Sequence, residues 1–343
     1  MKRRTFAQLS MSFLGGATLL SRWESKSIPL STEMSLQKTR GLRKGDRIGL
    51  ISPAGPIRPG QMKDAKKILA RLDLVPHPAP NCENQNGYLA GTDKERVSDI
   101  HYCLENDAID AIWCLRGGYG LTRILDQLDY ELFRKKAKSL IGYSDITALH
   151  LALYTQARLV SFHGPVLISD FNPYVEKTLE QVLYPQNEYP VILPSRDHTV
   201  EILKPGEAEG PLIGGNLSLL AALAGTSYLP SFKDHLVFIE DVEEEPYRID
   251  RMLTQLVHAA ELNKAAGIIL GQFAGCEKKP NDKYSFTLRE TLNSFVEKWS
   301  GPVLYGFSIG HIEKQCTLPL GIRARIDTQK PAIQFLESSI TTS

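Results

Sequence analysis

Short apolar runs alternate with amphipathic segments through the first half of the chain. Residues 48–51, 108–115 and 139–143 form runs whose length and β-branched or aromatic content are typical of buried strands. The segments between them carry apolar residues at helical spacing, at 62–72, 95–106 and 121–127. Strands that alternate with helices predict βαβ units and a mainly parallel sheet.

The pattern changes after residue 170. Residues 171–205 contain five prolines and few apolar runs, which is typical of a linker. Short apolar runs then return, with helical spacing at 247–260 and 285–299. We therefore expect an α/β protein with four parts: a leader (1–40), an N-terminal domain (41–170), a linker (171–206) and a mixed, β-rich C-terminal domain (207–335).

Composition narrows the function classes. The 343 residues include 40 Lys+Arg and 39 Asp+Glu, a net charge of +1, whereas a nucleic-acid binder usually has a basic excess. The hydrophobic content of 42% is that of an ordinary globular protein. Five widely spread cysteines form no C-x-x-C pair, so neither a disulfide framework nor a zinc knuckle is indicated.

The first residues differ from the rest of the chain. Arg3 and Arg4 precede a modest apolar stretch, Leu9 to Leu20, in the manner of a twin-arginine export signal. This stretch is shorter than the roughly 20 residues that span a bilayer, and no other stretch approaches that length. We expect no stable membrane insertion. Export predicts a periplasmic protein; the alternative is a basic N-terminal helix on a cytoplasmic one.

A glycine-rich loop follows the run at 108–115. Its sequence, Gly117-Gly118-Tyr119-Gly120, has neither the G-x-x-x-x-G-K-[ST] nor the G-x-G-x-x-G spacing, because Arg123 stands at the third glycine position. Phosphate binding is therefore weakly indicated. The remaining interpretations are a tight strand-to-helix turn and a pair of backbone amides that stabilise an oxyanion.

A serine nucleophile is a second possibility. Ser144 lies between a short strand and a helix, where its hydroxyl can project like that of a nucleophile elbow, although a helix N-cap is the commoner role. Among eight histidines, His163 and His311 lie at strand ends that suit a catalytic base. Glu240 ends an apolar strand and is the best acid, because the run 243–245 reads as a solvated turn. A metal site built from these residues lacks any recognised ligand spacing.

Several of these segments occur together, in one order, in a known family. The matching motifs are ISPAG (51–55), LRGGYG (115–120), IGYSDITA (141–148), GGNL (214–217), IEDV (239–242), EPYRIDRML (245–253), GH (310–311) and TLPLG (317–321). On these motifs, over roughly residues 46–325, the chain resembles the LD-carboxypeptidases, in the serine peptidase group that also contains microcin-immunity peptidases.

The resemblance implies roles for individual residues. Ser144 corresponds to the nucleophile, His311 to the general base and Glu240 to the acid that orients it. The amides of Gly118 and Asp145 correspond to the oxyanion hole. Ser144, Gly118 and Asp145 lie in a Rossmann-like N-terminal domain, whereas Glu240 and His311 lie in the C-terminal domain, so we expect the active site at the interface between the two domains.

The resemblance also implies a substrate. LD-carboxypeptidases remove a terminal D-amino acid, usually the D-alanine of a muropeptide tetrapeptide in peptidoglycan recycling, without a metal or organic cofactor, and the family suggests a homodimer. The alternatives are a microcin-immunity-like peptidase that acts on an aminoacyl-nucleotide or other peptide conjugate, and a muropeptide-binding module without activity. Arg116, Arg248 and Arg251 are candidates for binding the substrate carboxylate, and salt-bridge roles are equally consistent with the sequence.

Overall fold

The computed structural model describes residues 34–341, and the expected leader (1–40) lies mostly outside these residues. Within them, the first sheet has six strands in the order β13-β6-β5-β4-β2-β3. Its strands are β2 (Arg47–Ile51), β3 (Val75–Pro78), β4 (Ala111–Cys114), β5 (Ser139–Gly142), β6 (Phe162–His163) and β13 (Leu318–Pro319). All pair in parallel except β13, which comes from the far end of the chain and runs antiparallel to β6.

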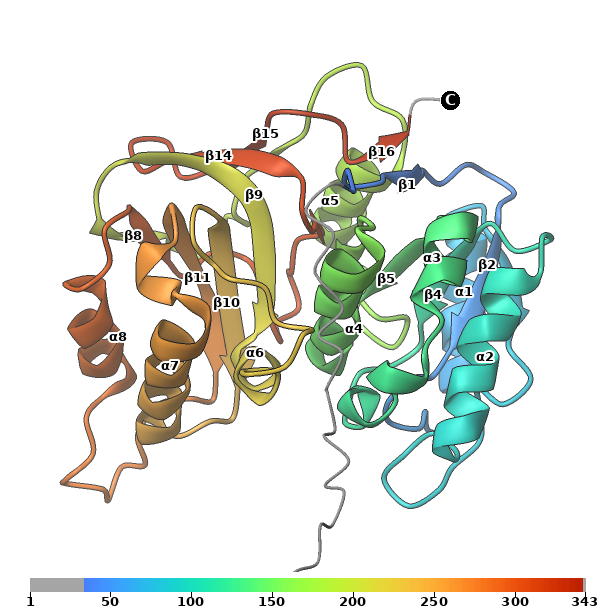
Figure 1. The fold of residues 1–343 in the computed structure, drawn as a ribbon, viewed down its shortest axis with the longest axis horizontal. Coiled ribbons are helices and arrows are strands. Elements are labelled where there is room, and N and C mark those ends of the chain that lie inside the picture. Colours follow the sequence, from blue (N-terminus) through green and yellow to red (C-terminus); the bar gives the residue numbers. More distant parts are fainter. Residues whose placement is uncertain (1–33, 342–343) are drawn as a thin grey trace, which may run out of the picture. The chain divides into compact units, whose positions relative to one another are not determined.

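Helices flank this first sheet, as Figure 1 shows. They are α1 (Gln61–Arg71), α2 (Asp93–Glu105), α3 (Tyr130–Lys136) and α4 (Thr147–Ala152). Thr92 begins α2 with a reciprocal capping box to Glu95, which satisfies two backbone amides at its start. The segment 121–127, expected as a helix, instead forms two 3₁₀ turns, because Gly120 with φ +131° and the non-helical Ile124 break the α-helical path.

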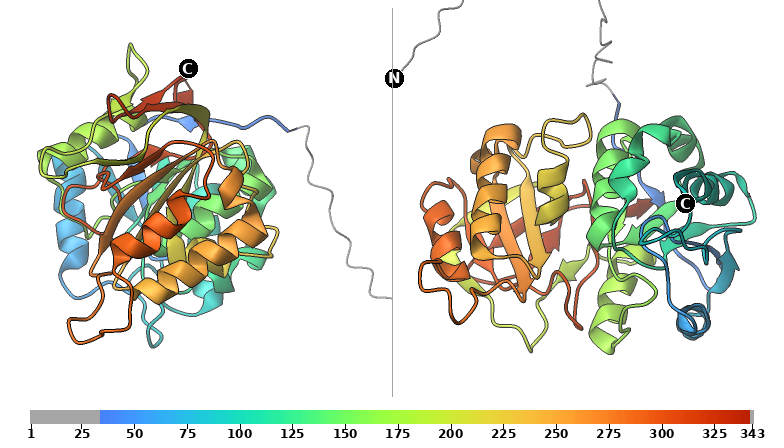
Figure 2. Two further views of the ribbon diagram at one scale, coloured as in Figure 1. Left: turned by 90° about the vertical axis from the view of Figure 1, so that its left-hand side faces the viewer. Right: turned by 90° about the horizontal axis from the view of Figure 1, so that it is seen from below.

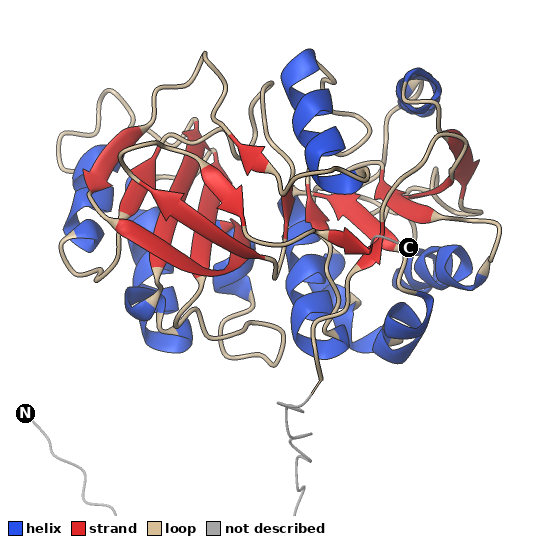
Figure 3. Cartoon of the chain, turned by 90° about the horizontal axis from the view of Figure 1, so that it is seen from above, coloured by secondary structure: helices blue, strands red, loops and turns tan. Residues whose placement is uncertain are grey.

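The second sheet is mixed. Within residues 34–341 it has eight strands in the order β7-β15-β14-β9-β10-β11-β12-β8, of which β9 to β12 are parallel. The strands are β7 (Val191–Ile192), β8 (Glu201–Lys204), β9 (Glu207–Asn216), β10 (Leu236–Val242), β11 (Gly267–Ala274), β12 (Val303–Tyr305), β14 (Arg323–Asp327) and β15 (Ile333–Phe335). Figure 3 draws these strands in red, as it does those of the first sheet. The α/β class, with a parallel N-terminal sheet and a mixed C-terminal one, is confirmed.

The helices of the second half are α5 (Pro173–Leu183), α6 (Leu217–Ala222), α7 (Pro246–Ala260) and α8 (Leu288–Val296). Figure 2 shows α7 and α8 against one face of the second sheet. The segment expected as a linker, 171–206, carries α5 and the edge strands β7 and β8. Strand β1 (Thr39–Arg40) pairs in parallel with β16 (Ile340–Thr341), which joins the two ends of the described chain.

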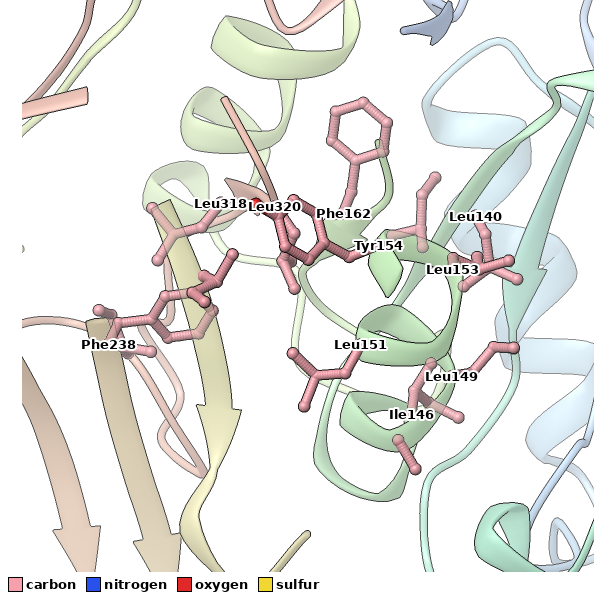
Figure 4. Close-up of a cluster of buried hydrophobic side chains, with 14 of the residues drawn as sticks. Leu140, Ile146, Leu149, Leu151, Leu153, Tyr154, Phe162, Phe238, Leu318 and Leu320 are labelled. Carbon is pink, nitrogen blue, oxygen red and sulfur yellow. The ribbon is translucent and has the colours of Figure 1, made fainter. Parts of the chain in front are cut away.

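Helix α4 lies between the two sheets and explains how they meet. All of its residues are buried, which is typical of a helix that is covered on every side. Figure 4 shows Leu151 on the side of Phe238 from β10, and Leu149 and Leu153 on the side of Leu140 from β5. The residue that precedes this helix by three positions, Ser144, is therefore held at the boundary between the two halves.

Among residues 34–341, no helix combines the length and the apolar character that crossing a membrane requires.

Candidate active site

Ser144 stands on a strained turn at the carboxyl end of β5. Its φ is +66°, in the left-handed region that non-glycine residues rarely adopt. The 3₁₀ turn Ser144–Ile146 then leads directly into α4. Gly142 allows this sharp path, since a Cβ atom there would come within 2.9 Å of the Ile146 side chain. Strain of this kind costs about 1–3 kcal/mol and is typical of functional sites.

Three side chains from separate elements form one hydrogen-bonded chain. His311 Nε2 lies 3.0 Å from Ser144 Oγ, and His311 Nδ1 lies 2.8 Å from Glu240 Oε2. A carboxylate can only accept, so Nδ1 carries the proton, and in the neutral ring Nε2 accepts from the serine hydroxyl. The structure thus brings together Ser144, His311 and Glu240, which lie up to 167 positions apart in sequence.

Glu240 is completely buried within β10, two residues before the strand ends at Val242. Burial by itself lowers the pKa of His311, but the hydrogen bond to Glu240 and the charges of Glu240, Asp241 and Glu243 outweigh it, so the pKa is raised above its usual value. The imidazolium is therefore stabilised relative to the neutral ring. That is the property a base needs when it takes a proton from a serine hydroxyl.

The next residue, Asp241, faces the opposite side of the strand and organises the start of α6. It accepts hydrogen bonds from Asn216 Nδ2 at 2.9 Å, and from the backbone amide and hydroxyl of Ser218 at 3.1 and 2.9 Å. Burial raises the pKa of Asp241 to about 6 despite these bonds. Asn216 in turn caps α6 through the Leu219 amide. Two neighbouring buried carboxylates thus have different partners.

In the Gly117-Gly118 turn, Gly117 packs against Ser144 and Gly118 packs against Gly55. A Cβ atom on residue 117 would lie 2.8 Å from Ser144 Cβ, and Gly118 adopts φ +114°. Within residues 34–341, no group accepts a hydrogen bond from the Gly118 amide. Gly55, from the loop after β2, donates its amide to Gly117 O at 2.9 Å and holds the turn from the other side. The predicted oxyanion amides of Gly118 and Asp145 both belong to segments next to Ser144.

Two charged side chains, those of Arg96 and Asp145, hold these loops together; the sequence predicted no role for Arg96 and only a backbone role for Asp145. Arg96 is buried in α2 and donates through Nη1 to Pro53 O at 2.6 Å and to Gly120 O at 3.0 Å. Asp145 accepts from the Leu121 amide at 2.9 Å, and burial raises the pKa of its carboxyl to about 6. An arginine on the apolar face of α2, four positions before Ile100, is the signal that could have identified the first of them.

A hollow of about 320 Å³ opens beside Ser144 and His311. Its walls include the Gly117-Gly118 turn, Tyr143, Ser169 and Arg116. The Tyr143 ring lies 4.9 Å from that of His311, between centroids, and covers one side of the base. Arg116 Nη1 is anchored by Pro56 O at 2.6 Å.

The other two arginine candidates lie on α7 and are not among the residues that line this hollow. The guanidinium groups of Arg248 and Arg251 stand 5.9 and 5.8 Å from the centre of the exposed Tyr247 ring. Arg248 also pairs with Glu244 across one turn.

His163, the second candidate base, does not reach Ser144 through any hydrogen bond of the described chain. It is buried between the rings of Tyr143 and Phe238, and burial holds its pKa well below the usual value. No group of three or more His, Cys, Asp or Glu in residues 34–341 is arranged to hold a metal ion. All five cysteines are buried and unpaired.

Known proteins resemble this chain in both sequence and structure. Residues 48–164 match the LD-carboxypeptidase N-terminal domain, and residues 209–326 match the LD-carboxypeptidase C-terminal domain. A Bacillus subtilis protein named "Probable murein peptide carboxypeptidase" is 39% identical over 307 residues, covering 86% of this chain and 93% of that protein. The Escherichia coli microcin C7 self-immunity protein MccF is 30% identical over 74% of this chain and 82% of its own length. The crystal structure of a muramoyltetrapeptide carboxypeptidase from Oxalobacter formigenes superposes with a TM-score of 0.74 at 29% identity, covering 84% and 97% of the two chains.

Proposed function

Because this chain belongs to the LD-carboxypeptidase family, we propose that it is a serine peptidase that hydrolyses the amide before a terminal D-amino acid. The substrate we propose is a muropeptide tetrapeptide that loses its D-alanine, as in peptidoglycan recycling. The observation that carries the proposal is the chain of hydrogen bonds from Ser144 through His311 to the buried Glu240, at the head of α4.

In the first half of the reaction, Ser144 Oγ attacks the carbonyl carbon of the scissile amide while His311 Nε2 takes its proton. Glu240 accepts the hydrogen bond from Nδ1, which keeps the ring in this tautomer and stabilises the imidazolium. The carbonyl oxygen becomes an oxyanion, for which the Gly118 and Asp145 amides are the proposed donors. One such donor is worth about 10²–10³ in rate. His311 then protonates the amine of the D-amino acid, which leaves, and an ester remains on Ser144.

In the second half, a water molecule replaces the departed amine. His311 takes one of its protons as the water oxygen attacks the ester carbonyl, and it returns that proton to Ser144 Oγ as the ester bond breaks. The products are the shortened peptide and free D-amino acid. No step uses a metal or an organic cofactor.

Arg116 is our candidate for the group that recognises a free terminal carboxylate. Among the described residues that line the hollow beside Ser144, it is the permanently charged cation. Its bond to Pro56 O uses Nη1, and the remaining guanidinium N–H groups are the donors that a carboxylate would need. Its place in the hollow favours it over Arg248 and Arg251, which lie beside Tyr247.

Similarity to MccF supports a second candidate, a peptidase that acts on an aminoacyl-nucleotide or another peptide conjugate. The same nucleophile, base and acid serve both substrates, so an assay must decide between them. The non-enzymatic alternative, a muropeptide-binding module, is disfavoured by the hydrogen-bond distances at Ser144.

The decisive experiment follows D-alanine release from L-Ala-γ-D-Glu-diaminopimelyl-D-Ala. The wild-type protein should release D-alanine. In Ser144→Ala the rate of this release should be lower by a factor of at least about 10³. Ser294→Ala, a similar change on α8, is the matched control and should keep wild-type activity. The same peptide with terminal L-alanine should remain intact. Binding without release by the wild type would favour the binding module, and equal release by Ser144→Ala would exclude Ser144 as the nucleophile.

A further inference from the structure

A second hollow, of about 510 Å³, lies between α5 and the segment 191–197. Lys177 from α5, Arg196 from the segment before β8 and Lys314 from the loop after His311 contribute cations to its walls. Tyr174 from α5 contributes an aromatic ring, whose hydroxyl donates to Leu193 O at 2.7 Å. We call this hollow, lined by these four side chains and Asp197, the cationic cleft.

The charges of the cationic cleft are unbalanced. Lys314 forms an ion pair with Asp197. Neither Lys177 nor Arg196 has an ion-pair or hydrogen-bond partner among residues 34–341, and both are exposed. The cleft therefore has a net positive charge with two cations free to bind an anion.

Shared lining residues place the cationic cleft near the hollow beside Ser144. An intermediate hollow of about 480 Å³ shares Ile168 and Ser169 with the hollow beside Ser144, and shares Asn172 with the cationic cleft. Asn172 also donates through Nδ2 to Glu313 O at 2.7 Å, so a residue that lines the cationic cleft is hydrogen-bonded to the loop that carries His311. Lys314 follows His311 by three residues, so their Cα atoms are at most about 11 Å apart.

We infer that the cationic cleft binds a carboxylate on the acyl side of the substrate, one residue before the residue that supplies the scissile carbonyl. This inference rests on the proposed function. In the tetrapeptide, the γ-linked D-glutamate leaves its α-carboxylate free, within roughly 10 Å of the scissile carbon. A guanidinium group such as that of Arg196 matches a carboxylate with two parallel hydrogen bonds, and Lys177 adds a point charge. The terminal D-alanine occupies the smaller hollow at the other end.

The test compares two substrates that differ in that one charge. One is L-Ala-γ-D-Glu-diaminopimelyl-D-Ala, and the other carries D-isoglutamine at its second position, so that the α-carboxylate is a neutral carboxamide. The wild type should have a kcat/KM about 5- to 10-fold higher for the acidic peptide, mostly through KM. The variant Lys177→Gln/Arg196→Gln should lose this preference and retain wild-type kinetics on the amidated peptide. Lys135→Gln on α3, which removes an exposed cation that forms no ion pair within residues 34–341, is the matched control and should preserve the preference.

Three results would overturn the inference in distinguishable ways. If the wild type cleaves both peptides with equal kcat/KM, the cleft does not bind the α-carboxylate, although the proposed function stands. If the double variant loses activity equally on both peptides, its effect is structural. If the wild type cleaves neither peptide, the proposed function fails and the inference fails with it.

Discussion

Gly310 lies directly against Glu240. A Cβ atom at residue 310 would come within 3.0 Å of Glu240 Oε2 and 3.1 Å of Gln272 O, and the glycine has a φ of +122°. We therefore expect Gly310→Ala to displace His311 or Glu240 and to lower kcat about 10-fold or more, since small displacements of catalytic groups have large effects. Steady-state kinetics of D-alanine release would measure it.

A comparison with Gly225→Ala separates contact from backbone strain. Gly225 also has a positive φ, +85°, but a Cβ atom there has no neighbour within 4 Å. In both variants the free energy of unfolding should fall by about 1–3 kcal/mol, which chemical denaturation measures. Only Gly310→Ala should lose kcat. Equal kinetic losses in the two variants would contradict a specific role for the Gly310–Glu240 contact.

The pH dependence of Glu240→Gln is a second prediction. Glu240 raises the pKa of His311 against the opposite effect of burial, and only the neutral imidazole can take the proton of Ser144. In the wild type, kcat/KM should rise with pH as His311 loses its proton, with a midpoint above the ordinary histidine value of about 6.5. In Glu240→Gln this midpoint should move to lower pH because the raising charge is gone. The maximal kcat should fall about 10²- to 10⁴-fold.

A pH–rate profile from about pH 5 to 9 checks both halves of that prediction. An unchanged midpoint in Glu240→Gln would show that other groups determine the His311 pKa. An upward shift would mean that the acid limb belongs to a different residue.

Much of the arrangement was predictable from the sequence. The strand–helix alternation of residues 48–143 predicts a parallel sheet, and parallel strands bring their carboxyl ends to one edge. Ser144 and Glu240 each follow an apolar run, so the position of Ser144 just after β5 follows from that pattern, whereas β10 continues two residues beyond Glu240. Loop context narrows the eight histidines to His163 and His311, and the family resemblance selects His311, but only the fold could bring it within 3.0 Å of Ser144 Oγ.

Other features depend on tertiary packing that local patterns do not encode. Leu318–Pro319 is too short to be recognised as a strand, yet as β13 it pairs with β6 from the other half of the chain. Helix α5 and strands β7 and β8 lie in the proline-containing segment 171–206, where few apolar runs were visible. The cationic cleft combines residues from 174 to 314 and has no signature in any single segment.

Arg96 leads to a prediction about stability. Its side chain is completely buried and contacts Pro53 O, Gly120 O and Asp93, so Arg96→Leu leaves the Pro53 carbonyl without its donor and leaves Gly120 O with the Arg123 amide alone. We expect the free energy of unfolding to fall by about 2–4 kcal/mol. Chemical denaturation measures the change.

Arg123→Gln is the matched control, because Arg123 pairs with the same Asp93 at the surface. Its side chain is 45% exposed, so the variant should unfold almost like the wild type. If Arg123→Gln were as destabilising as Arg96→Leu, the Asp93 ion pairs rather than the bonds to the two loops would account for the effect.

Export remains a prediction from the first residues of the sequence. Residues 1–35 fused to a folded reporter should carry it across the inner membrane, and Arg3→Lys/Arg4→Lys should abolish this transport. Cell fractionation measures the reporter in the periplasm and the cytoplasm. Transport that survives the double substitution would exclude the twin-arginine route, and a reporter that stays in the cytoplasm with the unaltered segment would favour the cytoplasmic alternative.

Arg116 provides the last prediction. If its guanidinium binds the terminal carboxylate, Arg116→Gln should raise KM about 10- to 100-fold for the tetrapeptide that ends in free D-alanine. The wild type should cleave the D-alanine amide of the same peptide poorly, and Arg116→Gln should change that slow reaction little. Arg248→Gln, which removes an arginine beside Tyr247 on α7, should match the wild type on both peptides. If Arg116→Gln lowered kcat/KM equally for both peptides, Arg116 would instead act by holding the loop at Pro56.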